Sequence, residues 1–366
     1  MKILYDHQIF SAQVFGGISR YFYELMSSFH LDRGVDFSLS LRYSNNSYLR
    51  GADWTQCKPF FPGSRFFGKT TLINTLNGFE SRRSIRSAQY DILHPTYYHP
   101  YYLPLVGTRP VVVTVYDMTH ELYPELFPAG DRTIAWKKAV LGSAAGIIAI
   151  SENTKKDLLR FYRLEEKRVA VVHLANSLQG GRGATALPDL PENYLLFVGQ
   201  RGGYKNFAFF AKTLAPLLRD NADLAIVCIG GGVFTQQERD MLTGLGIASR
   251  VRQFPVSDDA LVACYGRATA FVFPSLYEGF GIPILEAFSC GCPVLLSNRS
   301  SLPEIGGEAA LYFEPEDEES LRSAVVRIID DAGLRESLAA SGRARAREFS
   351  WEKVARETKA VYESLL

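Results

Sequence analysis

Short runs of apolar and β-branched residues alternate with amphipathic helical segments along the whole chain, and this alternation constrains the fold more than any other feature. In the first half, the candidate strands are "KILYD", "DILH", "RPVVVTVYD", "AAGIIAIS" and "RVAVVHL". Helices are predicted between them at roughly 17–31, 131–143 and 152–162. Buried strands joined through helices form parallel sheets with right-handed crossovers. The pattern therefore predicts an α/β fold.

The alternation stops between Ala175 and Glu192, where glycine, proline and small residues dominate as in an interdomain linker, and then it restarts. The candidate strands of the second half are "YLLFVG", "LAIVCIG", "RVRQF", "TAFVFPS" and "CPVLLS", and seven helices are placed between and after them, at roughly 205–219, 234–245, 257–265, 281–290, 317–331, 333–348 and 350–366. A chain of 366 residues exceeds what one hydrophobic core usually spans. We predict two Rossmann-like, doubly wound domains that face a cleft, at 1–175 and 176–348. The C-terminal helix at 349–366 is predicted to pack back on the first domain.

One short motif suggests a nucleoside triphosphatase. The stretch "GSRFFGKT", Gly63 to Thr70, fits the P-loop pattern G-x-x-x-x-G-K-[ST]. That pattern binds phosphate only where a buried strand runs into the loop and a helix leaves it. The preceding "DWTQCKPFFP" contains two prolines, which are confined to strand edges and bulges, so the supporting strand is doubtful. In favour of this alternative, "VVVTVYD" at 111–117 resembles a strand that ends in a magnesium-binding aspartate.

Composition excludes several other classes. A net charge of +1 gives no argument for nucleic-acid binding. The five cysteines form no paired C-x-x-C arrangement, so a disulfide framework or a zinc site is not expected. The opening "MKILYD" lacks the apolar segment of a signal peptide, and no apolar run approaches the ~18–20 residues that cross a bilayer. We expect a cytoplasmic protein.

Charge is distributed unevenly between Cys57 and Tyr90. This segment has one acidic residue, Glu80, and its basic residues are Lys58, Arg65, Lys69, Arg82, Arg83 and Arg86. Phenylalanines stand among them at 60, 61, 66 and 67. One interpretation is an ordinary solvated surface. The other is a patch at 57–90 that makes peripheral contact with the inner face of an anionic membrane, or with an acceptor carried on it.

The most informative stretch is "FPSLYEGFGIPILEAFSCGCPVLLS", residues 273–297. A candidate strand is followed by a tight loop that holds Glu278 and two glycines, and a helix then begins near Ile282. Such a loop presents free backbone N–H groups and the positive end of the helix dipole to an anion. Glu286 lies about one turn into the helix and can point toward the same ligand.

Two weaker glycine-rich turns also follow candidate strands. In "FVGQRGGYKNF", the turn carries Arg201 and Lys205, and cations at this end of a strand suit a diphosphate. In "VFGGISRYFYEL", Gly16 and Gly17 stand directly before a helix, so the backbone can approach a phosphate closely.

Together these motifs resemble the family 4 retaining glycosyltransferases of the GT-B fold, over nearly the whole chain. "VFGGISRYF" looks like the family's N-terminal glycine loop, and "VGQRGGYKN" looks like its Arg/Lys diphosphate motif. "YEGFGIPILE" matches its Glu–seven residues–Glu signature, the most specific of the three. The opening "ILYDHQIFSAQVFGGISRYFYEL" looks closest to bacterial mannosyltransferases of surface-polysaccharide (O-antigen type) assembly. The resemblance implies transfer of a hexose, with mannose from GDP-mannose as the best guess, to a saccharide or lipid-linked saccharide.

The resemblance also implies roles for domains and residues. The domain at 1–175 would bind the acceptor, and the domain at 176–348 would bind the nucleotide sugar. Glu278 would lie near the hexose and Glu286 on the ribose hydroxyls, while Arg201 and Lys205 would neutralise the leaving diphosphate. The other donor-binding candidates are Gly16, Gly17, Gly231, Phe280, Gly281 and Ile282.

On the acceptor side, "VVVTVYD" resembles the family's strand that ends in His-Asp, but the pair here is Tyr116-Asp117. Asp117 and His120 are catalytic candidates by this resemblance. His120, or His94 in "DILHPTYYH", could take over the contact of the missing histidine. The acceptor-side candidates are His94, Tyr97 and Tyr98. For either histidine, the alternative is a polar side chain that lines the cleft without a chemical role.

No two aspartates have the Asp-x-Asp spacing with which many transferases hold a metal. We therefore expect no metal requirement and no cofactor, with cationic side chains and backbone amides stabilising the leaving diphosphate. No pair of carboxylates close enough for a nucleophile and an acid is evident, so front-face attack is the mechanism that the resemblance implies. Two alternatives are kept: a P-loop nucleoside triphosphatase, and a non-catalytic binding protein of the same fold.

Overall fold

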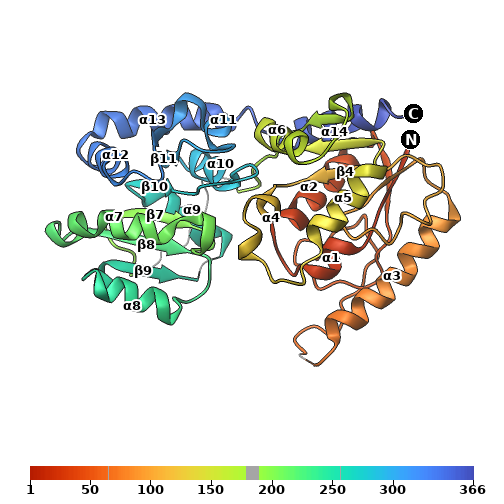
Figure 1. Ribbon diagram of the computed structural model, residues 1–366, viewed down its shortest axis with the longest axis horizontal. Helices are drawn as coiled ribbons and strands as arrows, with labels where there is room; N and C mark the ends of the chain where they lie inside the picture. The colour runs from red at the N-terminus through yellow and green to blue at the C-terminus, as the bar shows by residue number, and fades with distance from the viewer. Residues whose placement is uncertain (65, 179–188, 256) are drawn as a thin grey trace. The chain divides into compact units, whose positions relative to one another are not determined.

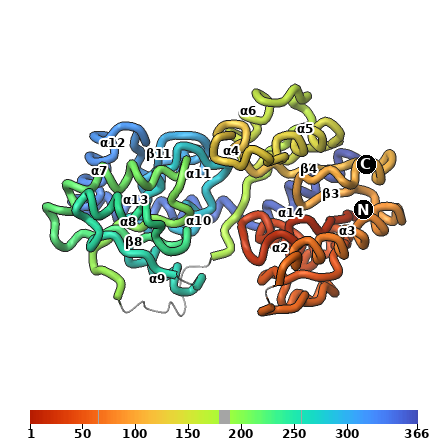
Figure 2. Tube along the Cα trace, turned by 60° about the horizontal axis from the view of Figure 1, so that its bottom comes forward, coloured from red at the N-terminus to blue at the C-terminus, as the bar shows by residue number. Residues whose placement is uncertain are grey.

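The computed structural model describes residues 1–64, 66–178, 189–255 and 257–366. It divides into two compact units: unit 1 comprises Met1–Leu174 and Trp351–Leu366, and unit 2 comprises Ala175–Ser350. Both chain ends therefore lie in unit 1, as Figure 1 and Figure 2 show. Within the predicted linker at 175–192, residues 179–188 lie outside the described residues.

Among its described residues, unit 1 contains six parallel strands. Their bounds are β1 (Lys2–Tyr5), β2 (Asp36–Leu39), β3 (Ile92–His94), β4 (Val112–Val115), β5 (Gly146–Ala149) and β6 (Val169–Val171). They form two sheets, β2-β1-β3 and β4-β5-β6, and a single parallel bridge between Leu93 and Val111 joins β3 to the start of β4. Strand β2 follows β1 in the chain and lies on one side of it, whereas the next strand, β3, lies on the other side. The direction in which strands are added to the sheet therefore reverses at β1. Such a position is a topological switch point, where open α/β sheets bind ligands.

The helices of unit 1 are α1 (Gln8–Ala12), α2 (Gly17–Asp32), α3 (Lys69–Ser87), α4 (Thr119–Leu122), α5 (Thr133–Ser143), α6 (Glu152–Phe161) and α14 (Trp351–Glu363), with 3-10 turns at Pro124–Leu126 and Glu166–Arg168. The last helix, α14, packs against α2 and β5. Its fully buried Tyr362 places its hydroxyl 2.9 Å from that of Tyr5 on β1. This contact ties the end of the chain to the first strand.

The described residues of unit 2 form a six-stranded parallel sheet with the order β12-β11-β10-β7-β8-β9. The strands are β7 (Asn193–Val198), β8 (Leu224–Ile229), β9 (Val251–Phe254), β10 (Ala270–Phe273), β11 (Val294–Ser297) and β12 (Leu311–Phe313). Numbered along the unit, this is the Rossmann order 3-2-1-4-5-6, and its switch point lies between β7 and β10. The structure thus confirms the α/β class with a Rossmann-like sheet.

The helices of unit 2 are α7 (Phe207–Asp220), α8 (Gln236–Gly244), α9 (Asp258–Arg267), α10 (Ile282–Ser289), α11 (Leu302–Gly306), α12 (Glu318–Asp330) and α13 (Ala332–Ala346), with 3-10 turns at Gly203–Lys205, Ala248–Arg250 and Gly307–Ala309. The core of the unit is formed by strand residues such as Ile226 and Val272, against helix residues such as Phe210 and Leu214. Burial of side chains of this size contributes roughly 1.5–3 kcal/mol each.

Hydrogen-bonding side chains mark where several helices begin. The N-caps of α6, α8, α9 and α12 are Ser151, Thr235, Ser257 and Asp317, and each accepts a backbone N–H of its own first turn. A cap of this kind stabilises a helix by roughly 0.5–2 kcal/mol.

Strands β2 and β12 were not predicted. Strand β2 lies at a sheet edge with partly exposed residues, and β12 has three residues, so neither has much apolar periodicity.

Candidate functional site

The switch point of unit 2 brings together the two loops that carry the strongest motifs. Strand β7 leads into the glycine turn before α7, and its neighbour β10 leads into the loop before α10. The backbone N–H of Leu276 donates to the carbonyl of Tyr204 at 2.8 Å, which ties one loop to the other. Lys205 Nζ lies 2.6 Å from Glu278 Oε1, and these side chains are only 17% and 11% exposed. Two predicted site residues that are far apart in the sequence therefore form an ion pair.

The loop that carries Glu278 is fixed by two serines that sequence analysis did not single out. The backbone N–H of Glu278 donates to Ser300 Oγ at 2.9 Å. Ser301 Oγ donates to the carbonyls of Glu278 and Phe280, at 2.9 and 3.0 Å. These bonds hold the carboxylate beside Lys205 before any ligand is bound.

Gly281 precedes the first residue of α10 and has a φ of +101°. A Cβ at this position would lie 2.9 Å from Ile284 Cδ1 and 3.2 Å from Leu302 Cδ2. Glycine is therefore required, both for the turn and for its packing. The helix that begins at Ile282 directs its first N–H groups and its positive dipole end toward this loop. The Phe280 ring is buried against Phe349, so only its backbone can serve a ligand.

Glu286 lies on α10, 8% exposed, and its Oε2 accepts a hydrogen bond of 3.0 Å from the Tyr265 hydroxyl. Tyr265 is fully buried on α9. Burial and the nearby Glu286 charge raise the pKa of Tyr265 well above its ordinary value, so the hydroxyl stays a donor. No local pattern in the sequence pointed to Tyr265, because the contact joins two different helices.

The side chain of Arg201 is buried and bound to other residues of unit 2. Its side chain is 2% exposed, and its Nε donates to Glu238 Oε1 at 2.7 Å. Its terminal N–H groups donate, at 3.0 to 3.3 Å, to the carbonyls of Gly230, Gly231, Gly232 and Val233. Because its donors are engaged in this way, Arg201 holds the turn that follows β8. Its predicted role in neutralising a leaving diphosphate stays a prediction.

The turn that Arg201 holds consists of three consecutive glycines with positive φ, 82°, 68° and 70° at Gly230, Gly231 and Gly232. A Cβ on Gly231 would lie 2.8 Å from Arg201 Nη1 and 2.9 Å from the Gly199 carbonyl. The predicted donor candidate Gly231 is thus required for the approach of Arg201. The turn lies at the carboxyl end of β8, next to β7 in the sheet.

Glu238 anchors Arg201 and also completes a capping box at the start of α8. Burial tends to raise the pKa of Glu238, but hydrogen bonds from Arg201 and Thr235 together lower it, so the carboxylate stays charged. The sequence held a usable signal for this residue: "TQQE" at 235–238 is a capping-box pattern.

In unit 1, Gly16 and Gly17 lie at the start of α2 as predicted from the motif. A Cβ on Gly16 would lie 2.5 Å from Gln13 Oε1, which accepts the Ser19 N–H, whereas Gly17 has open space around its Cα. The preceding Phe15 is 74% exposed. Contact of this loop with a phosphate stays a prediction.

His94 does not have the predicted acceptor-side position. It is fully buried on β3, with Nδ1 2.6 Å from the Tyr362 hydroxyl and Nε2 2.9 Å from Thr114 Oγ1. The ring also packs against Tyr5 and Phe22. A side chain with no exposed surface cannot contact an acceptor, and His94 does not line a cleft either, so both interpretations of this histidine placed it too near the surface.

Stability should therefore depend on pH through His94. Burial lowers the pKa of His94 to about 3, below the ordinary value of 6.5, so the folded state favours the neutral ring. A group whose folded pKa is depressed contributes full stability above its unfolded pKa and loses it as the pH falls. The free energy of unfolding should drop by about 1.4 kcal/mol per pH unit below pH 6.5 through this group. Urea denaturation from pH 7.5 to pH 5 would measure it, and the slope should be shallower in His94→Gln. Equal slopes would contradict the assignment.

The remaining candidates on the acceptor side are buried or half-buried. Tyr98 is 4% exposed and its hydroxyl accepts the Tyr116 N–H, and its contact with an acceptor stays a prediction. Asp117 accepts the Thr119 N–H at 2.9 Å. His120 stacks on Phe127 with ring centroids 3.6 Å apart, and roles for it and for Asp117 stay predictions.

The P-loop alternative is wrong. Residues 40–62, directly before the loop, contain no strand, and their one β-type pairing is an isolated bridge between Tyr43 and Lys58, so no strand supports the loop. Lys69 Nζ donates to the carbonyls of Phe61 and Ser64, at 2.8 and 2.9 Å. Carbonyl oxygens around the lysine would repel a phosphate, whereas a P-loop presents N–H groups.

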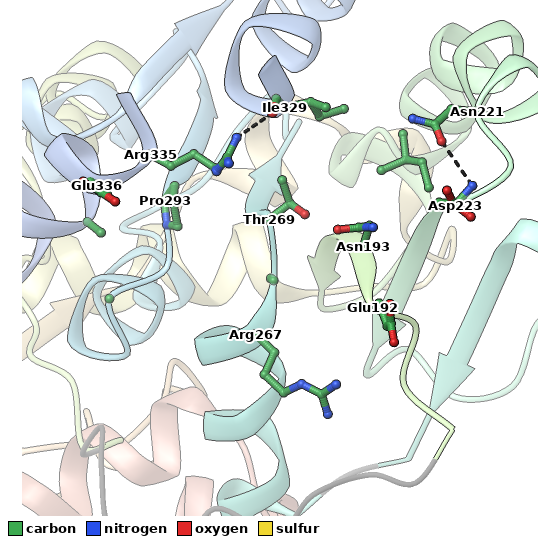
Figure 3. A pocket seen from close by; sticks show the side chains of 14 residues that line it. Glu192, Asn193, Asn221, Asp223, Arg267, Thr269, Pro293, Ile329, Arg335 and Glu336 are labelled. Carbon is green, nitrogen blue, oxygen red and sulfur yellow. Dashed lines mark hydrogen bonds between the residues drawn. The ribbon is translucent and has the colours of Figure 1, made fainter. Parts of the chain in front are cut away.

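A cavity of about 570 Å³ lies at the opposite edge of the unit 2 sheet. Figure 3 shows Glu192, Thr269 and Pro293 around it, and these residues directly precede β7, β10 and β11. Ligands of parallel sheets bind at the carboxyl ends of strands. This cavity is therefore not the candidate site.

The part of the chain that the structure describes contains no group of three or more His, Cys, Asp or Glu side chains arranged to hold a metal ion. In the same residues, no helix has the length and apolar character needed to span a bilayer.

Comparisons with known proteins match both halves of the chain. Residues 15–175 match the family described as Glycosyltransferase Family 4, and residues 185–345 match Glycosyl transferases group 1. The chain is 29% identical to O-antigen chain mannosyltransferase B of Escherichia coli, over 95% of this chain and 96% of that protein. It is also 29% identical to O-antigen chain mannosyltransferase RfbU of Salmonella typhimurium, over 62% of each chain.

Solved structures share the fold. Sucrose-phosphate synthase from Thermosynechococcus elongatus has a TM-score of 0.74 at 20% identity, with 100% of this chain and 98% of that chain covered. The Anabaena protein HepE, solved with UDP and glucose, has a TM-score of 0.74 at 18% identity, with both chains fully covered. At these identities the likeness concerns the fold alone, and it agrees with the predicted GT-B class.

Proposed function

The chain belongs to the family 4 glycosyltransferases of the GT-B fold, and from this premise we propose that it transfers mannose from GDP-mannose to a saccharide acceptor. The relatives named as O-antigen mannosyltransferases support the sugar, and the motif loops of unit 2 support the place of donor binding. We propose further that the acceptor is lipid-linked and is reached from the cytoplasmic face of the membrane.

The observation that carries the proposal is the pairing of Lys205 with Glu278 at the β7/β10 switch point. Both side chains are largely shielded from water, so their charges act at short range with little screening. A nucleotide diphosphate placed between the β7 and β10 loops would meet the Lys205 ammonium and the first N–H groups of α10. Glu278, held beside Lys205, would then face the hexose attached to that diphosphate.

The chemistry requires stabilisation of negative charge. When the sugar–phosphate bond breaks, positive charge develops at the anomeric carbon and negative charge on the departing diphosphate. Lys205 and the amides at the start of α10 oppose the negative charge, and such preorganised groups supply the largest part of many rate enhancements. Arg201 contributes by holding the glycine turn beside β7, as a positioning residue. Attack of the acceptor from the face that the diphosphate leaves would retain the anomeric configuration.

The test is a transfer assay with GDP-mannose, other nucleotide sugars as competitors, and EDTA. We expect transfer to persist in EDTA, because side-chain cations and amides neutralise the leaving group. Transfer lost in EDTA and restored by Mg²⁺ or Mn²⁺ would contradict a metal-independent mechanism. A preference for another nucleotide sugar would revise the donor, and nucleotide binding without any transfer would favour a binding protein of this fold.

Helix α3, which runs along the outer edge of unit 1 in Figure 1, supports the membrane contact. Leu72, Leu76 and Phe79 are 44%, 37% and 71% exposed, and Arg83 and Arg86 continue the same spacing of three and four residues. One face of the helix is therefore apolar and then basic. We call these five residues the α3 stripe.

The loop before α3 extends this surface. Phe61, Phe66 and Phe67 are 58%, 43% and 106% exposed. Phe60 does not belong to it, because it is 5% exposed and packs against Tyr43. Arg65 lies outside the described residues. The predicted patch at 57–90 is thus narrower than the sequence suggested, but it keeps both an apolar and a basic part.

Vesicle co-sedimentation would measure the contact. Changing Arg83 and Arg86 together to glutamate should weaken binding to anionic vesicles at least about tenfold, because each basic residue contributes about 1 kcal/mol near such a surface. Changing Phe67 and Phe79 to serine should also weaken it, whereas Leu31→Ser, an exposed apolar control on α2, should not. Binding should fall with salt. Equal recovery with neutral and anionic vesicles would contradict the proposal.

A further inference from the structure

A lysine is buried in unit 1 behind the loop that carries Asp117 and His120. Lys137 lies in the interior of α5, and its side chain is 1% exposed. Its ammonium lies 3.0 Å from the carboxylate of Glu121 on α4, whose side chain is 4% exposed. Helices α4 and α5 pack against each other, as Figure 2 shows. This ion pair belongs to unit 1 and takes no part in the donor motifs of unit 2.

Stability alone does not explain a buried ion pair of this kind. Taking two charges out of water has a large cost, and apolar residues of similar volume often give an equally stable or more stable protein. Removing only one partner, in contrast, is strongly destabilising, because it leaves an uncompensated charge in the interior. The other contacts of the ammonium supply a reason for the lysine at position 137.

The ammonium also donates to the backbone of Asp117. Lys137 Nζ lies 3.0 Å from the Asp117 carbonyl oxygen. That carbonyl lies beyond the β4–β5 ladder, whose last register pair is Val115 with Ala149, and before the first residue of α4. Lys137 therefore fixes the backbone at the point where the strand has ended and the helix has not yet begun.

A second side chain fixes the neighbouring peptide. The Tyr98 hydroxyl accepts the Tyr116 N–H at 3.2 Å, and the Lys137 ammonium lies 5.2 Å from the centroid of the Tyr98 ring. The Asp117 carboxylate accepts the Thr119 N–H at 2.9 Å, so its direction depends on the backbone of this loop. Fixing the backbone of Asp117 therefore also fixes its carboxylate.

The ion pair is anchored by a third helix. Glu121 Oε1 accepts a hydrogen bond of 2.6 Å from the Tyr162 hydroxyl, and Tyr162 directly follows α6. Burial and the bond to Glu121 raise the pKa of Tyr162 well above its ordinary value, so the hydroxyl stays a donor. We call Lys137, Glu121 and Tyr162 the buried triad. It connects α4, α5 and the end of α6 to the loop that carries Asp117.

The charge of Lys137 also reaches His120. Burial, and after it the Lys137 ammonium, lower the pKa of His120, whereas the carboxylates of Asp117, Asp131 and Glu121 act in the opposite direction. The His120 ring is therefore neutral at pH 7. Lys137 thus acts on both catalytic candidates of this loop, on one through its backbone and on the other through charge.

We propose that Lys137 is a positioning residue for sugar transfer, which sets the direction of the Asp117 carboxylate by holding the Asp117 carbonyl. The inference rests on the proposed function, with Asp117 among the reacting groups, and it adds a residue that contacts no substrate. An ammonium suits this role because it has three donors and can bind a backbone oxygen and a carboxylate at once. Its burial then serves the geometry of the site rather than the stability of the fold.

The test replaces the buried triad by apolar side chains of similar size. In the triple variant Lys137→Met, Glu121→Leu, Tyr162→Phe, no charge or hydroxyl of the triad is left without a partner, so the melting temperature should stay within a few degrees of wild type or rise. The kcat of transfer should nevertheless fall at least about tenfold, because small displacements of reacting groups slow catalysis strongly. The Kd for GDP-mannose should be unchanged, because the donor motifs that carry the proposed site lie in unit 2.

Two controls accompany the triple variant. Lys137→Met alone should lower the melting temperature by several degrees, since the buried Glu121 loses its partner. The double variant Lys155→Met, Glu166→Gln removes another ion pair of unit 1, whose side chains are 22% and 72% exposed. It should leave both the melting temperature and kcat unchanged.

Asp117→Asn shows whether the triad acts through Asp117. If it does, adding the triple variant to Asp117→Asn should slow transfer no further than Asp117→Asn alone, because residues that act as a unit are not additive. Fully multiplied losses, wild-type kcat in the triple variant or in Asp117→Asn, or a triple variant that melts far below wild type would each overturn the inference. All four results leave the proposed function intact, whereas a wild type that transfers no sugar from any nucleotide sugar would reject the proposed function itself.

Discussion

Replacing Lys205 by alanine should lower kcat/KM for sugar transfer at least about 100-fold, the largest effect that we expect from a single substitution. The ammonium lies at the switch point of unit 2, where a leaving diphosphate would gain its charge. Its loss also leaves Glu278, 11% exposed, without its 2.6 Å partner, so a negative charge would then face an anionic substrate. Both consequences act in the same direction, against the departing diphosphate.

A variant of the partner residue, Glu278, tests the carboxylate separately from the Lys205 ammonium. In Glu278→Gln, Lys205 keeps its charge but is no longer paired with a carboxylate that competes with the diphosphate for it. Affinity for GDP should therefore be unchanged or higher, while kcat falls. Two lysine controls are available: Lys212→Ala, at an exposed lysine of α7, and Lys69→Ala, in the P-loop-like segment. Neither should change turnover by more than about threefold, a surface effect. Transfer by Lys205→Ala within threefold of wild type would contradict the proposed site, and an inactive Lys69→Ala beside it would revive the triphosphatase interpretation.

Replacing Glu286 by alanine should weaken the affinity for the donor by about 1–3 kcal/mol, or roughly 5- to 150-fold in Kd, since ribose hydroxyls buried against it would lose their acceptor. Glu286 is 8% exposed on α10, so solvent cannot easily replace the lost carboxylate. The same substitution removes the acceptor of the buried Tyr265 hydroxyl, which adds a stability cost that the measurement must separate.

Tyr265→Phe provides that separation. It removes the hydroxyl that orients Glu286 but keeps the carboxylate, so its effect on donor affinity should be smaller than that of Glu286→Ala. Glu336→Ala is a further control, because Glu336 lines the cavity at the opposite edge of the unit 2 sheet. Titration of GDP and GDP-mannose into each variant gives the affinities directly. If Glu286→Ala binds the donor as tightly as wild type, or if Glu336→Ala is the variant that loses it, the ribose assignment is wrong.

The sequence by itself determined the order of elements and the class of protein. Periodicity is a local property, so the apolar runs predicted β7, β8 and β10 closely, and the "YEGFGIPILE" signature carried the family resemblance that the comparisons confirm. Glycine positions could also be predicted, because a left-handed backbone conformation such as that of Gly281 requires a glycine at that residue itself.

Only the tertiary structure decided which polar residues meet and which are buried. His94 ends a buried strand and Lys205 follows one. His94 is enclosed by Tyr362, 268 residues away, whereas Lys205 pairs with Glu278, 73 residues away. Arg201 looked like a free cation in its motif, but Glu238 and the glycine turn after β8 engage its donors. The physical reason is that the energy of a charge depends on its neighbours in space and on its exposure to water, and both depend on which strand lies beside which.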